Sequence, residues 1–185
     1  MKRLFIAFKI TPDTNYLSIY NRIKNARSAD RITWVKPDVT HFTLHFFGET
    51  AENNIPVISE CARKAVSENE TFEIRIANTG IFGSRYDPRV IWFGIDPNEK
   101  LTQLHSNLKN ELATQGWIPD RQNFVPHITV GRIKEIRDKT LFQEDMNKVR
   151  NAFIMQQKVD HITLYESILH PQGPEYIALE EFRLK

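Results

Sequence analysis

Two short segments of the sequence place a histidine and a threonine two residues apart. They are His41-Phe42-Thr43-Leu44 and His127-Ile128-Thr129-Val130. On a β-strand, residues two apart face the same side of the sheet, with their Cα atoms about 6.5–7 Å apart. Each segment therefore presents an imidazole and a hydroxyl on one face and two apolar side chains on the other.

Two such segments facing each other would suit acid–base chemistry at a phosphodiester. The pKa of histidine lies near 6.5, so one ring can be neutral while its partner is protonated near neutral pH. A general base and a general acid each contribute roughly 10²–10⁴-fold to a rate. The threonine hydroxyls can donate hydrogen bonds to the non-bridging oxygens. Because this chemistry requires neither a metal nor a cofactor, we predict none.

The two segments occupy equivalent positions in the two halves of the chain. Ile6 lies 35 residues before His41, and Trp92 lies 35 residues before His127. The same offset of 86 residues relates the apolar residues 4–6 to residues 90–92. A fixed offset that carries both a strand and a reactive segment indicates an internal duplication. If the halves are related by a pseudo-two-fold axis, the two histidines confront each other across a groove.

The surrounding sequence alternates between strand and helix patterns. We expect strands at 4–10, 41–47, 72–76, 90–95, 127–133, 159–168 and 176–184, and helices near 11–23, 54–66, 101–112 and 141–149. Thr11 with Pro12 and Asn54 with Pro56 are expected to begin the first two helices. No linker or low-complexity stretch interrupts residues 1–185. We therefore predict an α+β protein in a single, two-lobed domain.

The composition is that of an ordinary globular protein, with 41% hydrophobic and 26% charged residues. The 25 basic and 23 acidic residues give a net charge of +2, which excludes a strongly basic nucleic-acid coat protein. The single cysteine excludes an intrachain disulfide. The amino-terminal apolar run is too short for a signal peptide, and no run approaches the roughly 20 residues that span a bilayer. We expect a cytoplasmic monomer that does not associate with membranes.

The remaining histidines are weighed by their positions. His161-Ile162-Thr163-Leu164 repeats the pattern but lacks an equivalent at the 86-residue offset, so we interpret His161 as an ordinary strand residue. His105 borders a leucine stripe and is interpreted as an interfacial histidine, and His170 lies in an expected turn.

His45 follows His41 at a spacing that on a helix is typical of zinc ligands. On a strand the two rings would lie about 13 Å apart, too far to share one ion. Strict alternation places His45 on the same face as Thr43. We therefore predict no metal site here and consider His45 a candidate substrate contact.

The reactive segments and their flanks resemble the 2H phosphoesterases, in particular the RNA 2′,3′-cyclic phosphodiesterases, which are also called 2′-5′ RNA ligases. The resemblance covers nearly the whole chain. It rests on residues 32–37 with 41–49, residues 80–82 with 89–92, residues 124–132, and residues 164–167 with Gly173, Pro174 and Tyr176.

This resemblance implies a fold of two pseudo-symmetric lobes, each an antiparallel sheet with helices, around a central groove. It also implies hydrolysis of 2′,3′-cyclic phosphate at RNA ends to a 2′-phosphate. By the family pattern, His41 is the proton donor to O3′ and His127 is the proton acceptor that activates water. Thr43 and Thr129 would hold the phosphate, and the partner would be RNA or a nucleotide with a cyclic end.

Two further residues are candidate substrate contacts. Arg132 stands where the family often carries an arginine, but strict alternation points it away from Thr129, and only a bulge at Gly131 would turn it toward the groove. The alternative for Arg132 is a surface salt bridge. Phe46 could stack on a nucleobase, with core packing as its alternative.

Other functions share these residues. The same acid–base pair would serve a 2′-5′ RNA ligase, a 2′-5′ phosphodiesterase or a hydrolase of small cyclic phosphates. A non-catalytic RNA-binding module is a further alternative, although two intact histidine–threonine pairs argue against it.

Overall fold

The computed structural model describes residues 1–117 and 124–185, which form two β-sheets and four α-helices. The strands are β1 (Lys2–Lys9), β2 (Arg31–Trp34), β3 (His41–Thr50), β4 (Phe72–Gly83), β5 (Pro88–Ile95), β6 (His127–Glu135), β7 (Phe153–Val159), β8 (His161–His170) and β9 (Gly173–Arg183). The helices are α1 (Thr14–Ala26), α2 (Ile55–Ser67), α3 (Glu99–Thr114) and α4 (Lys139–Val149). Two short 3-10 turns, η1 (Pro37–Val39) and η2 (Glu52–Asn54), precede β3 and α2.

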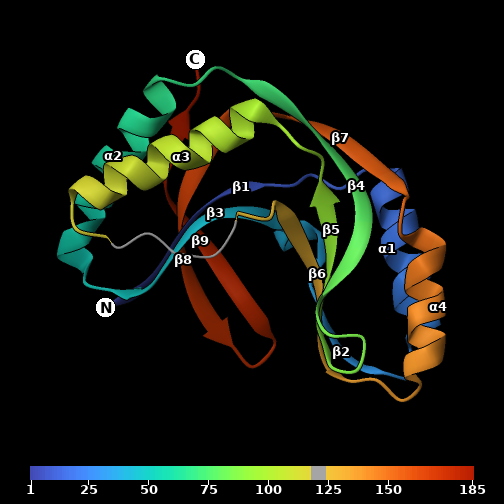
Figure 1. The fold of residues 1–185 in the computed structure, drawn as a ribbon. Coiled ribbons are helices and arrows are strands. Elements are labelled where there is room, and N and C mark those ends of the chain that lie inside the picture. Colours follow the sequence, from blue (N-terminus) through green and yellow to red (C-terminus); the bar gives the residue numbers. More distant parts are fainter. Residues whose placement is uncertain (118–123) are drawn as a thin grey trace.

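All paired strands are antiparallel, and each sheet has helices on its outer side. One sheet has the strand order β3-β1-β8-β9, and the other has the order β2-β6-β5-β4-β7. Helices α2 and α3 pack together beside the first sheet, and α1 and α4 pack together beside the second (Figure 1). The α+β fold of two antiparallel lobes expected from the sequence is thereby confirmed.

The two halves of the chain exchange elements between the sheets. Helix α1 follows β1 of the first sheet but packs against β7 and α4 of the second. Helix α3 follows β5 of the second sheet but packs against α2 beside the first. The strands are exchanged as well. Strand β4 comes from the first half of the chain but pairs with β5 in the second sheet, and β8 comes from the second half but pairs with β1 in the first sheet. Neither sheet with its helices is therefore built from one half of the chain alone.

Several element boundaries differ from those expected. The strand expected at 159–168 corresponds to β8, which begins at His161, and only Val159 of the expected range belongs to another strand, β7. Strand β2 and most of β7 were not expected, since four residues are too short for a clear alternation and residues 153–158 show none. Asp13 rather than Thr11 caps α1, because its carboxylate accepts a 2.7 Å hydrogen bond from the backbone N–H of Tyr16.

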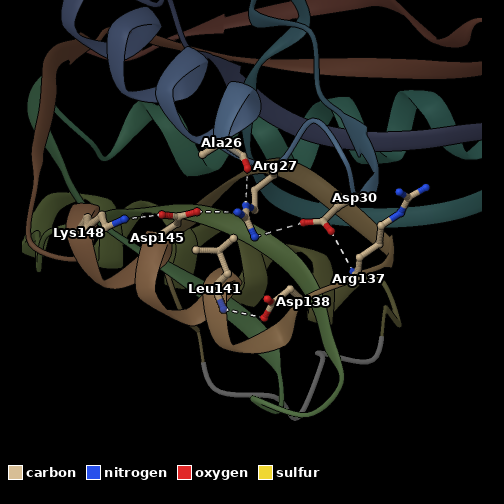
Figure 2. Close-up of polar contacts among 8 residues, drawn as sticks. All are labelled: Ala26, Arg27, Asp30, Arg137, Asp138, Leu141, Asp145 and Lys148. Carbon is tan, nitrogen blue, oxygen red and sulfur yellow. Dashed lines mark hydrogen bonds and ion pairs between the residues drawn. The ribbon is translucent and has the colours of Figure 1, made fainter.

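A buried ionic cluster fastens α1 to α4 (Figure 2). The guanidinium of Arg27, which caps the carboxyl end of α1, lies 2.7 Å from the carboxylate of Asp145 on α4 and 3.5 Å from that of Asp30. Its Nε–H donates to the carbonyl of Ala26 at 2.8 Å, and Asp30 also accepts a hydrogen bond from the backbone N–H of Arg137. The side chains of Arg27 and Asp30 are only 6% and 4% exposed. Each charge is therefore buried, and a buried charge is stable only when an opposite charge compensates it.

Within residues 1–117 and 124–185, no helix combines the length and apolar character needed to cross a bilayer.

Candidate active site

A groove of about 690 Å³ opens between the two sheets. Strands β3 and β6, which carry the two reactive segments, contact each other. Four of the predicted residues, namely His41, Thr43, His127 and Thr129, line this groove together. The fold therefore brings the two histidine–threonine pairs into one cavity.

The two histidines are anchored in the same way. The Nδ1 of His41 lies 2.9 Å from the carbonyl oxygen of Val39, and the Nδ1 of His127 lies 2.8 Å from that of Val125. Both carbonyls belong to the residue two positions earlier, so the contacts obey the 86-residue offset. Because a carbonyl only accepts, Nδ1 carries the proton in each ring, and Nε2 is left to exchange protons.

Aromatic side chains hold both imidazoles in place. The ring of His41 lies 5.1 Å from that of Phe5 and packs edge-on against Tyr176 at 4.9 Å. The ring of His127 packs edge-on against Phe82 at 4.7 Å. These contacts restrict ring rotation, which favours proton transfer in a fixed direction.

The surroundings of His41 favour its neutral form in the free protein. Burial lowers the pKa of His41, and the positive charge of Arg132 lowers it further, while the hydrogen bond to Val39 opposes both effects. A bound phosphate anion would act in the opposite direction, because a nearby negative charge stabilises the imidazolium.

Matching β-bulges interrupt the two reactive strands. In β6, Thr129 pairs with Trp92 and Gly131 with Ile91, so Val130 is an extra residue. In β3, Thr43 pairs with Ala7 and His45 with Ile6, so Leu44 is an extra residue. Residues 44 and 130 are again 86 positions apart. Each bulge shifts the alternation of side chains by one residue after the threonine.

The bulge in β6 turns Arg132 toward the groove, where its side chain forms part of the lining. The register shift was expected at Gly131 and lies at Val130, one residue earlier. Phe46, the equivalent of Arg132 at the 86-residue offset, also lines the groove and is 50% exposed. The guanidinium of Arg3 lies 4.8 Å from the centre of the Phe46 ring. Phe46 thus lies outside the core.

The expected position of His45 is wrong. The bulge at Leu44 removes His45 from the face of Thr43 and pairs it with Ile6, and among the described residues that line the groove His45 does not appear. Its ring lies 4.5 Å from that of Phe47. Burial lowers the pKa of His105 on α3 to about 4, with smaller effects from Lys109 and His45, so His45 lies toward α3.

His161 lies away from the groove. Its Nδ1 lies 2.6 Å from the carboxylate of Asp160, and its Nε2 lies 3.8 Å from that of Glu181. In the part of the chain that the structure describes, no group of three or more His, Cys, Asp and Glu side chains could hold a metal ion.

Two walls of the groove were not predicted as site residues. One is β2 with the chain that follows it, including Trp34 and Lys36, and the other is the hairpin of β8 and β9, including His170 and Tyr176. His170 pairs with Glu175 at 2.9 Å. The first wall had a signal, because it precedes the first reactive segment directly. The hairpin carried only the family resemblance of residues 164–167, Gly173, Pro174 and Tyr176, because its approach to the groove depends on the pairing of β8 with β1.

The fold and site define the class to which the protein belongs. The sequence profile of the 2′-5′ RNA ligase superfamily matches residues 16–169. The chain is therefore a member of the 2′-5′ RNA ligase superfamily.

Particular relatives are similar along almost the entire chain. An RNA 2′,3′-cyclic phosphodiesterase from Methanothermobacter thermautotrophicus is 34% identical over 184 residues, with 98% of each chain covered. One from Thermotoga maritima is 32% identical, with 97% of this chain and 94% of the relative covered. LigT from E. coli in its apo form superposes with a TM-score of 0.72 at 25% identity, covering 100% of this chain and 98% of LigT. A crystal structure from Thermus thermophilus reaches 0.81 at 26% identity, covering 98% of this chain and 97% of the other.

Proposed function

We propose that the protein hydrolyses 2′,3′-cyclic phosphodiesters at RNA ends to 2′-phosphomonoesters, without a metal ion. The observation that carries this proposal is the pair of equivalent histidines, each with Nδ1 bound to a backbone carbonyl and Nε2 available in one groove. The names of the relatives support the same substrate class.

In the proposed reaction, Nε2 of His127 accepts a proton from water as the water oxygen bonds to phosphorus. The bond from phosphorus to O3′ breaks, and Nε2 of His41 gives its proton to O3′. The products are a 2′-phosphate and a free 3′-hydroxyl. Thr43 and Thr129 would donate hydrogen bonds to the non-bridging oxygens, and Arg132 would balance their negative charge.

The lowered pKa of His41 is compatible with a proton donor only when substrate is present. The cyclic phosphate carries one negative charge, which would raise the pKa of His41 on binding. The role of acid is thus assigned to the bound complex, and the free protein holds His41 mainly neutral.

The histidine roles can be tested with a short RNA that ends in a 2′,3′-cyclic phosphate, in the presence of EDTA. We expect a 2′-phosphate product at an undiminished rate, and His41→Ala and His127→Ala should each lose roughly 10²–10⁴-fold. His161→Ala serves as the matched control and should retain its activity. Loss of activity in EDTA that zinc restores, or near-normal turnover by a folded His41 or His127 variant, would contradict the mechanism.

A substrate with a good leaving group separates the two roles. An aryl phosphodiester releases a weakly basic phenolate, which needs no proton. The His41→Ala variant should therefore recover most of its activity on this substrate, and His127→Ala should not. The reverse pattern would exchange the acid and the base.

Ligation is the second candidate, favoured by the name of the superfamily. If the 5′-hydroxyl of another RNA replaced water as the nucleophile, the same step would form a 2′-5′ linkage. An added 5′-hydroxyl RNA acceptor would reveal this reaction as a longer product in the same assay.

A further inference from the structure

The hairpin of β8 and β9 brings a tyrosine into the groove beside the proposed acid. Strand pairing sets Tyr176 of β9 opposite Ser167 of β8, and both residues line the groove. The hairpin stands across the groove from β2 and β6 (Figure 1). Strands β3 and β9 are the two outer strands of the first sheet, so the contact between His41 and Tyr176 crosses β1 and β8. The fold thus brings Tyr176 to His41 from the far edge of the same sheet.

Three aromatic rings form a closed cluster at this point. The ring of Phe5 lies 5.1 Å from that of His41 and 5.1 Å from that of Tyr176, and the last two rings are 4.9 Å apart. Because each ring contacts the other two, the position of the Tyr176 ring is fixed relative to the imidazole. A phenylalanine side chain would make the same ring contacts, so the cluster does not account for the hydroxyl.

The hydroxyl of Tyr176 is available to a ligand in the groove. Within residues 1–117 and 124–185 it forms no hydrogen bond. Tyr176 is half-buried and lines the groove, and its hydroxyl is not one of the polar atoms that are sealed from solvent without a partner. A tyrosine hydroxyl that is withdrawn from bulk water normally has a hydrogen-bond partner. A molecule bound in the groove would supply the partner that the described residues do not.

Positive charge surrounds this hydroxyl. Arg132 and Arg3 both line the groove, and neither forms an ion pair with another described residue. Burial raises the pKa of the Tyr176 phenol, and the charges of Arg132 and Arg3 oppose this effect, so both charges act at the phenol itself. Because the raised pKa keeps the phenol protonated near neutral pH, the hydroxyl is a donor in a positively charged site. Such a site suits the oxygens of a phosphate.

We propose that Tyr176 is a further substrate-binding residue, whose hydroxyl donates a hydrogen bond to a non-bridging oxygen of the cyclic phosphate. This inference rests on the proposed function. The neighbours of Tyr176 in the groove are His41 and Arg132, which the proposed reaction places at O3′ and at the phosphate charge. A phosphate held between these two groups lies beside the phenol. The Tyr176 hydroxyl would thus add to the hydrogen bonds that Thr43 and Thr129 donate.

The kinetic test removes the hydroxyl and keeps the ring. Tyr176→Phe should lower kcat/KM on a short RNA with a 2′,3′-cyclic end about 10-fold or more, because a hydrogen bond to a charged group is lost. Tyr165→Phe is the matched control, since Tyr165 also packs on Phe5, at 5.2 Å, but is not among the described residues that line the groove. It should leave kcat/KM unchanged. Equal kcat/KM of Tyr176→Phe and the unchanged protein would overturn the proposal.

An aryl phosphodiester separates a contact with phosphate from an effect on His41. This substrate keeps the phosphate but needs no proton from His41, so Tyr176→Phe should lose about as much activity on it as on the RNA. A loss that occurs on the RNA and disappears on the aryl substrate would mean that the hydroxyl acts through His41, and the proposed contact would be wrong.

A binding test does not depend on turnover. Adenosine 2′-phosphate carries the phosphate of the expected product, and calorimetry measures its Kd. This Kd should rise about 10-fold in Tyr176→Phe and stay unchanged in Tyr165→Phe. If the protein failed to hydrolyse cyclic ends but Tyr176→Phe still weakened binding, the proposed function would fail and the contact would stand. Normal hydrolysis with an unaltered Kd in Tyr176→Phe would remove the contact and leave the proposed function intact.

Urea unfolding separates binding from folding. Because the Tyr176 hydroxyl has no partner among the described residues, Tyr176→Phe should leave the urea midpoint unchanged. A lower midpoint together with unchanged RNA kinetics would give the hydroxyl a purely structural role and contradict the proposal.

Discussion

At the scale of single residues, the bulge at Leu44 decides which neighbour of Thr43 reaches the groove. His45 is turned toward α3, and Phe46 lines the groove with half of its surface exposed. The bulge at Val130 does the same for Arg132. Phe46 and Arg132 are 86 residues apart, but one offers an aromatic face and the other a charge. The two lobes therefore line the groove with different chemistry.

Adjacent substitutions test the effect of the bulge. Phe46→Leu should raise KM for a cyclic-ended RNA roughly 5-fold or more, since a stacked base contributes about 1–3 kcal/mol. His45→Gln should leave KM and kcat within a factor of two or so, because its ring is turned away from the groove. Steady-state kinetics of the two variants measure the difference. A larger effect of His45→Gln than of Phe46→Leu would count against the assigned register.

His105 should make stability depend on pH. Its pKa in the folded protein is lowered to about 4, mainly by burial, with contributions from Lys109 and His45, whereas the unfolded chain has a value near 6.5. Between these values the unfolded chain binds more protons, so the free energy of unfolding decreases as the pH falls below about 6.5.

The expected contribution of His105 is about 1 kcal/mol lost between pH 7 and pH 5, because solvent screens part of the effect at a half-buried ring. Urea unfolding of the protein and of His105→Gln at both pH values isolates this loss as a difference between the two. The decrease should be smaller in His105→Gln, which keeps the contribution of other groups such as His41, whose pKa burial also lowers. An identical decrease in both proteins would assign the pH dependence to other groups.

At the scale of elements, α1 and α4 come from different halves of the chain and are joined by the cluster around Arg27. Asp145 lies on α4, and Asp30 lies between α1 and β2. Strand β2 forms one end of the second sheet, and the chain after it lines the groove. The cluster therefore supports a wall of the site from the outer side of the sheet.

Removing the central charge should be strongly destabilising. Arg27→Met leaves the buried carboxylate of Asp30 without an ion pair in the part of the chain that the structure describes, while Asp145 keeps its pair with Lys148 at 2.7 Å. Breaking a buried ion pair costs about 3–5 kcal/mol. Arg31→Met is the matched control, because its pair with Glu135 is exposed and contributes at most about 1 kcal/mol. Urea unfolding of both variants gives the comparison. Equal stability of the two would show that the cluster does not hold the helices together.

At the scale of the whole molecule, the exchange of α1 and α3 and of β4 and β8 makes the two halves interdependent. The groove lies where β3 and β6 meet, so each half supplies one histidine and one threonine. The hairpin of β8 and β9 closes one side of the groove from the carboxyl-terminal end of the chain. A complete site thus requires both halves to fold together.

Cutting the chain tests this interdependence. The turn between β4 and β5 is exposed, so a break after Tyr86 should be tolerated. Fragments 1–86 and 87–185 should each lack a cooperative unfolding transition, because each lacks the partner of its own sheet. Mixed together, they should regain both the transition and the activity. Circular dichroism during thermal unfolding checks this, and a cooperatively folded single fragment would contradict the exchange.

The sequence by itself determined the two histidine–threonine pairs, their 86-residue relation and the α+β class. These features depend on residue type and local periodicity, which are readable along one chain. Tertiary structure alone decided the exchange of elements between the sheets and the positions of His45, Phe46 and Arg132. Bulges form where a strand meets the hydrogen bonds of its partner, so a strict alternation rule fails after residues 44 and 130. The approach of the β8–β9 hairpin likewise depends on a pairing with β1 more than 150 residues away, which no local pattern contains.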